Sequence, residues 1–165
     1  MYEAKRGLIE ESGFSIFRFH DYWHRHEPDG ILTGMTSARG WSEYQAGPNA
    51  KRFDIPECSF EALIRDVKAN LGISAVRAAG APDMPCNSVV LLAGSTPGQV
   101  QIQALMEGAD VVMCGESNEW DTCEYVRDAA AVGQRDSSCS ATAIRRMAEC
   151  ATWRTGSGIA LEMAF

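Results

Sequence analysis

Two short apolar segments constrain the fold of this chain most strongly. They are SVVLLAG at residues 88–94 and ADVVMCG at residues 109–115. Apolar runs of this length between turn residues are typical of strands buried on both faces of a sheet. The intervening STPGQVQIQALMEG predicts a helix that begins near Pro97. Strands that alternate with helices indicate an α/β fold, predicted here as a mixed sheet with helices packed on it.

Further helices are predicted by their spacing and their end signals. Residues 2–11 are predicted to form a helix, and FEALIRDVKANLG follows Ser59 and ends at Gly72, a good C-terminal residue. Asp29 is a candidate N-cap for a short helix in ILTGMTSARG. Asn118 is a candidate cap for a helix in the segment before residue 134.

The remaining strand predictions are shorter. FSIFRF at residues 14–19 is aromatic and β-branched, and RFDIP predicts a strand that ends at Pro56. SAVRAAG predicts a further short strand.

Charge and hydropathy exclude two kinds of partner. The formal net charge is -7, whereas nucleic acids and anionic membrane surfaces need a basic face. No apolar run approaches the ~20 residues of a membrane span. The start, MYEAKRGLIEESG, is an amphipathic helix pattern rather than a signal peptide. We therefore expect a cytoplasmic protein.

The six cysteines form no C-x-x-C pair and have no histidine near them in sequence. This spacing argues against a zinc ribbon or a thioredoxin-like motif. We expect buried or free thiols.

All three histidines lie in FRFHDYWHRHEPDG, residues 17–30, where His20, Asp21, His24 and His26 occupy seven positions. Imidazole and carboxylate side chains in such a cluster are typical of a metal site. An aromatic surface patch or a hydrogen-bonded loop would have the same composition, and spacing alone leaves these alternatives open. The His-Asp pair also occurs in metal-dependent phosphohydrolases, but those are all-helical and draw further ligands from distant helices.

Polar residues follow both apolar segments. AGSTPG could bind an anion through its backbone N–H groups, but it lacks the Lys-Ser/Thr pair of a nucleotide-binding loop, which favours a tight turn. Glu116 and Glu119 either face a cleft or are solvated. Trp120 and Tyr125 are predicted to be core or subunit contacts rather than ligand platforms.

Several segments together resemble one known family. GADVVMCGE at residues 108–116 is similar to its GADVxITGE segment, and AGSTPG to its glycine-rich turn. With SIFRFHDYWHRHEPDGI, these segments resemble the dinuclear-metal-centre hexameric proteins, the NGG-one-interacting-factor-three-like family, also called GTP cyclohydrolase type 2 homologues. The resemblance covers roughly residues 2–134 and rests on the order and spacing of the motifs.

The resemblance implies a divalent metal, Zn, Mn or Fe, with His20, Asp21 and His24 as ligands and Glu116 as a catalytic residue. His24 stands where the family usually has an aspartate, and this change shifts the preference toward softer ions. The family also implies a homo-oligomer, a hexamer, and a small-molecule substrate.

Residues 135–165 differ in character from residues 1–134, the family-like α/β region. Permitted codons for Ser140 to Trp153, read one base out of register, spell a segment like the family's Gly-His-x-x-Ser-Glu-x-x-Gly-Met metal-binding end. Our hypothesis is that this atypical tail is frameshifted and that the fold is incomplete relative to the family. We expect the tail to avoid the central strand position and to be disordered, or at best to form a short helix near residues 141–152. The strand at 109–115 would then keep an exposed edge or apolar face.

Two classes of function follow. The first is a metal-dependent hydrolase-type protein that activates water against a phosphorylated or heterocyclic substrate. The alternative is a non-enzymatic hexameric assembly or regulatory module. Turnover of a substrate would favour the hydrolase, whereas capture of a partner without turnover would favour the assembly module.

Overall fold

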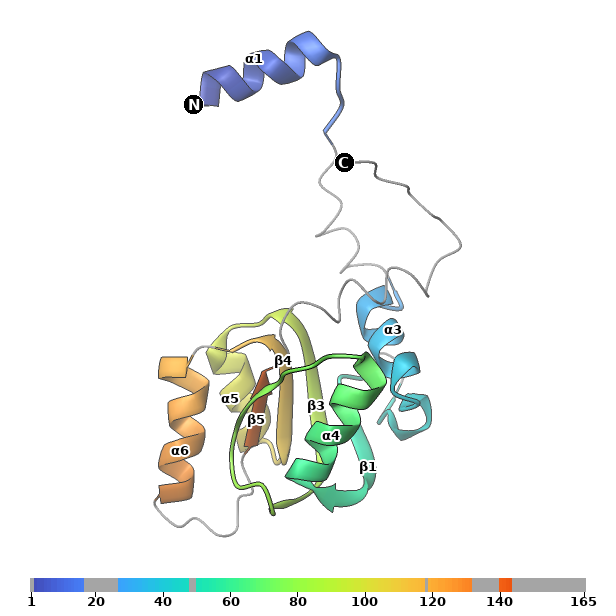
Figure 1. Ribbon diagram of the computed structural model, residues 1–165, viewed down its shortest axis with the longest axis vertical. Coiled ribbons are helices and arrows are strands. Elements are labelled where there is room, and N and C mark those ends of the chain that lie inside the picture. The colour runs from blue at the N-terminus through green and yellow to red at the C-terminus, as the bar shows by residue number, and fades with distance from the viewer. Residues whose placement is uncertain (1, 17–26, 48–49, 118, 132–139, 144–165) are drawn as a thin grey trace.

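The computed structural model describes residues 2–16, 27–47, 50–117, 119–131 and 140–143. Within them, five strands form one sheet in the order β1-β3-β4-β5-β2 (Figure 1). The strands are β1 (Arg52–Ser59), β2 (Arg77–Ala79), β3 (Pro85–Ser95), β4 (Val111–Glu116) and β5 (Ser140–Ala143). β3, β4 and β5 are parallel, whereas β1 pairs with β3 and β2 with β5 in antiparallel fashion. The predicted α/β fold with a mixed sheet is confirmed.

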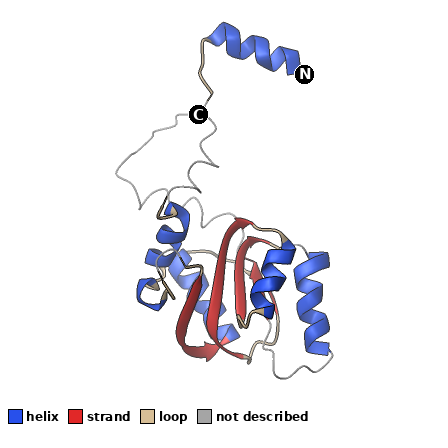
Figure 2. Ribbon diagram, turned by 180° about the vertical axis from the view of Figure 1, so that it is seen from behind, coloured by secondary structure: helices blue, strands red, loops and turns tan. Residues whose placement is uncertain are grey.

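Helices cover both faces of the sheet (Figures 1 and 2). The helices α3 (Gly30–Ala38) and α4 (Phe60–Leu71) pack on one face, and α5 (Gly98–Met106) and α6 (Glu124–Ala131) pack on the other. Along β4, Val111 and Met113 join the first cluster, while Val112 and Cys114 join the second. This alternation explains the continuous apolar run, because each side chain of the strand enters a core.

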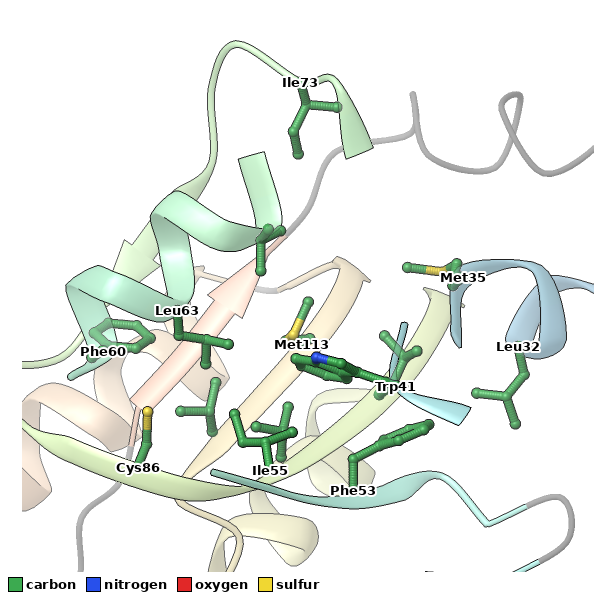
Figure 3. Packing of buried hydrophobic residues seen from close by; sticks show 14 of the residues in the cluster. Leu32, Met35, Trp41, Phe53, Ile55, Phe60, Leu63, Ile73, Cys86 and Met113 are labelled. Carbon is green, nitrogen blue, oxygen red and sulfur yellow. The ribbon is translucent and has the colours of Figure 1, made fainter. Parts of the chain in front are cut away.

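The core between the sheet and α3 and α4 contains the largest buried side chains (Figure 3). Phe53 of β1 lies below Trp41, which follows α3, and Met113 of β4 lies in the same cluster. The rings of Trp41 and Phe53 have centroids 5.6 Å apart and are tilted by 43°. This aromatic pair joins the segment after α3 to the edge strand.

Local end signals predicted the helix boundaries. The carboxylate of Asp29 accepts hydrogen bonds from the backbone N–H groups of Ile31 and Leu32 at 2.9 and 3.3 Å. The Ser59 hydroxyl accepts from the Ala62 N–H at 3.2 Å. Gly72 has the left-handed φ of 63° that ends α4 without steric cost.

The first helix, α1 (Tyr2–Ser12), confirms the prediction for residues 2–11. None of its residues is buried. The strand predicted at 14–19 is absent from residues 14–16, which have no regular structure, and its other half lies outside the described residues. No helix in the described ranges is long and apolar enough to cross a membrane.

The prediction that Pro56 ends its strand is wrong, because β1 continues to Ser59. β1 is the edge strand, and its register with β3 shifts between Asp54 and Cys58. A proline, which lacks a backbone N–H, is tolerated at such an irregularity on an edge.

The expectation that the tail avoids the central strand position is also wrong. β5 lies between β4 and β2, so both edges of β4 are paired. Residues 141–143 therefore belong to a strand and not to the expected helix. The physical reason is that strand pairing satisfies backbone groups and does not depend on long apolar side chains. The remaining tail residues lie outside the described ranges.

Two short segments complete the described structure. η1 (Ser42–Tyr44) is a single turn between α3 and β1. η2 (Glu119–Cys123) is a π-helical turn that leads directly into α6. The predicted cap Asn118 lies outside the described residues.

Candidate functional site

The candidate site lies at the end of the sheet where the parallel strands β3 and β4 reach their carboxyl termini. Ser95 and Glu116 lie opposite each other in the register of the two strands. The helix α5 begins three residues after Ser95, and η2 begins three residues after Glu116. In open α/β sheets, ligands bind outside the carboxyl ends of the strands, where loops and helix N-termini converge.

Two glycines bring these strand ends close together. A Cβ atom added to Gly115 would lie 2.8 Å from the carbonyl oxygen of Gly94 and 3.0 Å from its N and Cα atoms. Gly94 itself has a φ of 75°, which L side chains rarely adopt. Glycine at both positions therefore lets the two backbones meet directly before Glu116.

The buried side chain of Gln101 links the two strand ends. Its Nε2 group donates to the carbonyl oxygen of Thr96 at 2.8 Å and to that of Glu116 at 3.0 Å. Gln101 is fully buried, and its Oε1 atom has no hydrogen-bond partner. Bonds to both loops fix the backbone of Glu116 relative to the β3–α5 turn.

Sequence reasoning missed Gln101. The available signal was its helical spacing from Leu105, four residues later, because both side chains face the sheet. A polar residue in such a row indicates a buried side chain that needs hydrogen-bond partners.

The start of α5 is occupied by another part of the chain. The Asp121 carboxylate lies where a Cβ atom on Gly98 would be, and the Thr122 hydroxyl is 3.3 Å from that position. Negative charge is favourable at a helix N-terminus. The carboxylate of Asp121 thus takes the place that an anion would occupy, which supports the tight-turn interpretation of AGSTPG.

Glu116, the predicted catalytic residue, is the last residue of β4 and is exposed. Glu119, the other carboxylate noted after this strand, forms an ion pair with Arg77 of β2. Within the described residues, no group of three His, Cys, Asp or Glu side chains could hold a metal ion. The described part of this edge therefore does not fit a metal by itself, and His20, Asp21 and His24 lie outside the described ranges.

The thiols of the described region are free, as predicted. Cys114 is buried below the edge, and burial raises the pKa of its thiol to about 12, with a smaller contribution from Cys123. The Ser117 hydroxyl lies 3.6 Å from the sulfur of Cys123. At neutral pH the Cys114 thiol stays protonated and packs as an apolar side chain.

The aromatic residues after β4 differ in their positions. Trp120 is 78% exposed, so its prediction as a core residue is wrong, and its alternative as a subunit contact stays a prediction. Tyr125 is partly buried against the cluster on the α5 and α6 side of the sheet. Trp120 belongs to the π-helical turn η2 that precedes α6, whereas Val126 of α6 is part of this cluster.

The sequence matches no known family model, and no curated protein is significantly similar to it. Its fold is similar to two crystal structures of Staphylococcus aureus protein SA1388, each with 24% sequence identity, a TM-score of 0.51 and 64% of this chain covered. A Bacillus cereus protein related to NIF3 matches at 21% identity and a TM-score of 0.45 over 57% of this chain. The chain spans 31%, 27% and 23% of these solved chains, respectively. The likeness to SA1388 concerns the fold alone.

Proposed function

We propose that this chain carries the α/β part of a divalent-metal-dependent, hydrolase-type protein of the dinuclear-metal-centre family, the GTP cyclohydrolase type 2 homologues. The fold similarity to SA1388 and the GADVVMCGE segment support this proposal. The observation that carries it is the position of Glu116. This carboxylate-bearing residue ends β4 beside the end of β3, with its backbone held by Gln101.

In the proposed site, His20, Asp21 and His24 would hold the metal ion, which would be Zn, Mn or Fe. A bound divalent ion supplies Lewis-acid chemistry and lowers the pKa of water. Glu116 orients the attacking water and accepts its proton. The substrate is a small phosphorylated or heterocyclic molecule that approaches the carboxyl edge of β3 and β4.

Metal binding and turnover test these roles separately. Equilibrium dialysis of the full chain against Mn²⁺, Zn²⁺ or Fe²⁺ should give at most one bound ion per chain, because the candidate ligands form a single cluster in the sequence. His20→Ala and His24→Ala should each reduce this occupancy at least tenfold. Glu116→Gln should keep the ion and lose metal-dependent hydrolysis of the probes GTP and p-nitrophenyl phosphate.

Glu107→Gln is the matched control, because Glu107 follows α5 at the opposite edge of the sheet. It should leave both occupancy and turnover unchanged. Two ions per chain, or full occupancy in the histidine variants, would contradict the assigned ligands. Full turnover in Glu116→Gln would contradict its role.

A non-enzymatic assembly module is the second candidate, and exposed apolar side chains favour it. Tyr2, Leu8, Phe14, Ile16 and Trp120 are each between 66% and 78% exposed. Side chains of this kind are often covered by another polypeptide. A homohexamer in light scattering, with metal bound but no turnover of any probe, would favour this function over the hydrolase.

A further inference from the structure

Two cysteine side chains lie side by side on the edge strand β1 and its neighbour β3. They are at the opposite end of β3 from Ser95, the partner of Glu116. Cys58 of β1 and Cys86 of β3 are direct partners in the antiparallel register. Their sulfur atoms are 4.0 Å apart, and the Cys86 thiol donates to the carbonyl oxygen of Cys58 at 3.3 Å. The two side chains therefore lie on the same face of the sheet and point toward each other.

Their surroundings give the two thiols different properties. Cys86 is buried within the core, below Phe60 (Figure 3), whereas Cys58 is half-buried and reaches solvent. Burial raises the pKa of the Cys86 thiol to about 12, and the charges of Cys58, Asp110 and Glu57 act in the same direction. A dissolved oxidant therefore meets Cys58 first, and Cys86 remains a protonated thiol beside it.

The register of the two strands suits a disulfide, because Cys58 and Cys86 are directly opposed in an antiparallel pair. Directly opposed residues in antiparallel strands have Cα atoms roughly 4.5–5.5 Å apart. Disulfides span Cα distances of roughly 4.4–6.8 Å. The sulfur atoms would need to approach by about 2 Å, which rotation about the two Cα–Cβ bonds can supply.

We propose that Cys58 and Cys86 form a site of reversible oxidation that converts a peroxide to water and closes a disulfide between β1 and β3. The Cys58 thiol releases its proton to water, and its sulfur attacks one peroxide oxygen, so that an S–O bond forms, the O–O bond breaks and hydroxide leaves. The released proton converts this hydroxide to the first water. The Cys86 sulfur then attacks the Cys58 sulfur, which breaks the S–O bond. The second hydroxide leaves and takes the Cys86 proton. Two thiols and one hydrogen peroxide thus give one disulfide and two waters.

The position of this link has a structural consequence. Cys58 immediately precedes Ser59, the N-cap of α4, and follows the register shift near Pro56. The disulfide would fasten the irregular edge strand to β3 at the point where the chain enters α4. A reducing thiol would cleave the disulfide and free the edge strand again.

Mass spectrometry of the full chain tests the proposal. The reduced protein is freed of reductant, treated with one equivalent of hydrogen peroxide and digested with trypsin without reduction. We expect loss of two hydrogens per chain and a link between peptides 53–65 and 78–127, localised by fragmentation to Cys58 and Cys86. Dithiothreitol should reverse both changes. Mixing with ¹⁵N-labelled protein should give no mixed-isotope link, since the bond is within one chain.

Variants provide the control. Cys58→Ser and Cys86→Ser should each abolish the disulfide. Cys123→Ser replaces another half-buried cysteine, and this variant should form the Cys58–Cys86 disulfide as completely as the wild type. A link from Cys58 to another cysteine, or sulfinic acid at Cys58 with Cys86 still reduced, would overturn the proposal. Because the wild-type peptide map decides this by itself, a variant that fails to fold does not affect the result.

Discussion

The Cζ atom of Arg39 lies 3.7 Å from the centre of the Trp41 ring, inside the core beneath α3 and α4. Its Nη2 atom pairs with Asp66 at 3.1 Å, and Nη1 lies 3.9 Å from the sulfur of Met113. Burial lowers the pKa of Arg39 to about 10, and the Asp66 carboxylate partly opposes this shift. A desolvated cation over tryptophan contributes about 2 kcal/mol, and the contacts with Asp66 and Met113 connect this segment to α4 and β4.

Arg39→Ala should lower the free energy of unfolding by about 2–4 kcal/mol, because it removes the stacking and leaves a cavity. Arg39→Lys should lose less, since it keeps the charge and the aliphatic stem but not the planar group. Urea denaturation followed by tryptophan fluorescence measures both. An Arg39→Ala variant as stable as the wild type would show that the contact is energetically neutral.

The Asp110 carboxylate holds the start of β4 to β3. Its Oδ2 atom accepts from the N–H groups of Asn87 and Ser88, both at 2.9 Å. Asp110→Ala should cost about 2–3 kcal/mol, since two N–H groups lose a charged acceptor. Asp110→Asn keeps a neutral acceptor and should cost less. Thermal unfolding of the three proteins gives the ranking, and equal losses in both variants would contradict this explanation.

Gly115→Ala should cost about 1–3 kcal/mol, because its Cβ would press on the backbone of Gly94. Neither backbone can move without separating the strand ends at the candidate site. The control is Gly7→Ala in α1, where an added Cβ meets no atom within 4 Å. That variant should be neutral or slightly stabilising. Chemical denaturation with equal losses for both glycines would rule out the close approach.

The free energy of unfolding should fall as pH rises above about 8.5, because the buried Cys114 thiol keeps its proton only in the folded chain. Burial raises the pKa of its thiol to about 12 in the folded chain, whereas an unfolded cysteine titrates at about 8.5. Between these values the unfolded chain loses this proton while the folded chain keeps it, so rising pH favours unfolding. From pH 8 to 10 the wild type should lose about 2 kcal/mol more than Cys114→Ala. Parallel pH dependences for the two proteins would place the Cys114 thiol in contact with water.

Local signals explain which parts of the fold the sequence reveals. The strands at 88–94 and 109–115 could be predicted because burial on both faces produces a continuous apolar run. Asp29 and Gly72 act on neighbouring N–H and C=O groups, so their roles are visible in sequence.

The other features depend on contacts between distant segments. β5 could not be predicted, because its pairing arises from the edge that β4 offers rather than from its own small, polar residues. Gln101 finds its partners on two loops at the strand ends, and the continuation of β1 past Pro56 depends on its place at the sheet edge. Of the candidate site, the sequence indicated the place of Glu116 after a buried strand. It did not indicate the glycine contact that aligns the strand ends.

The most direct test of the proposed site is to locate a bound ion relative to Glu116. Paramagnetic Mn²⁺ added to the ¹⁵N-labelled full chain broadens the amide signals of nearby residues. Broadening should centre on residues 95–98 and 115–117 and should disappear when His20 and His24 are both replaced by alanine. Broadening that centres on Glu107 at the opposite edge, or that survives the double replacement unchanged, would contradict a metal site at the carboxyl ends of β3 and β4.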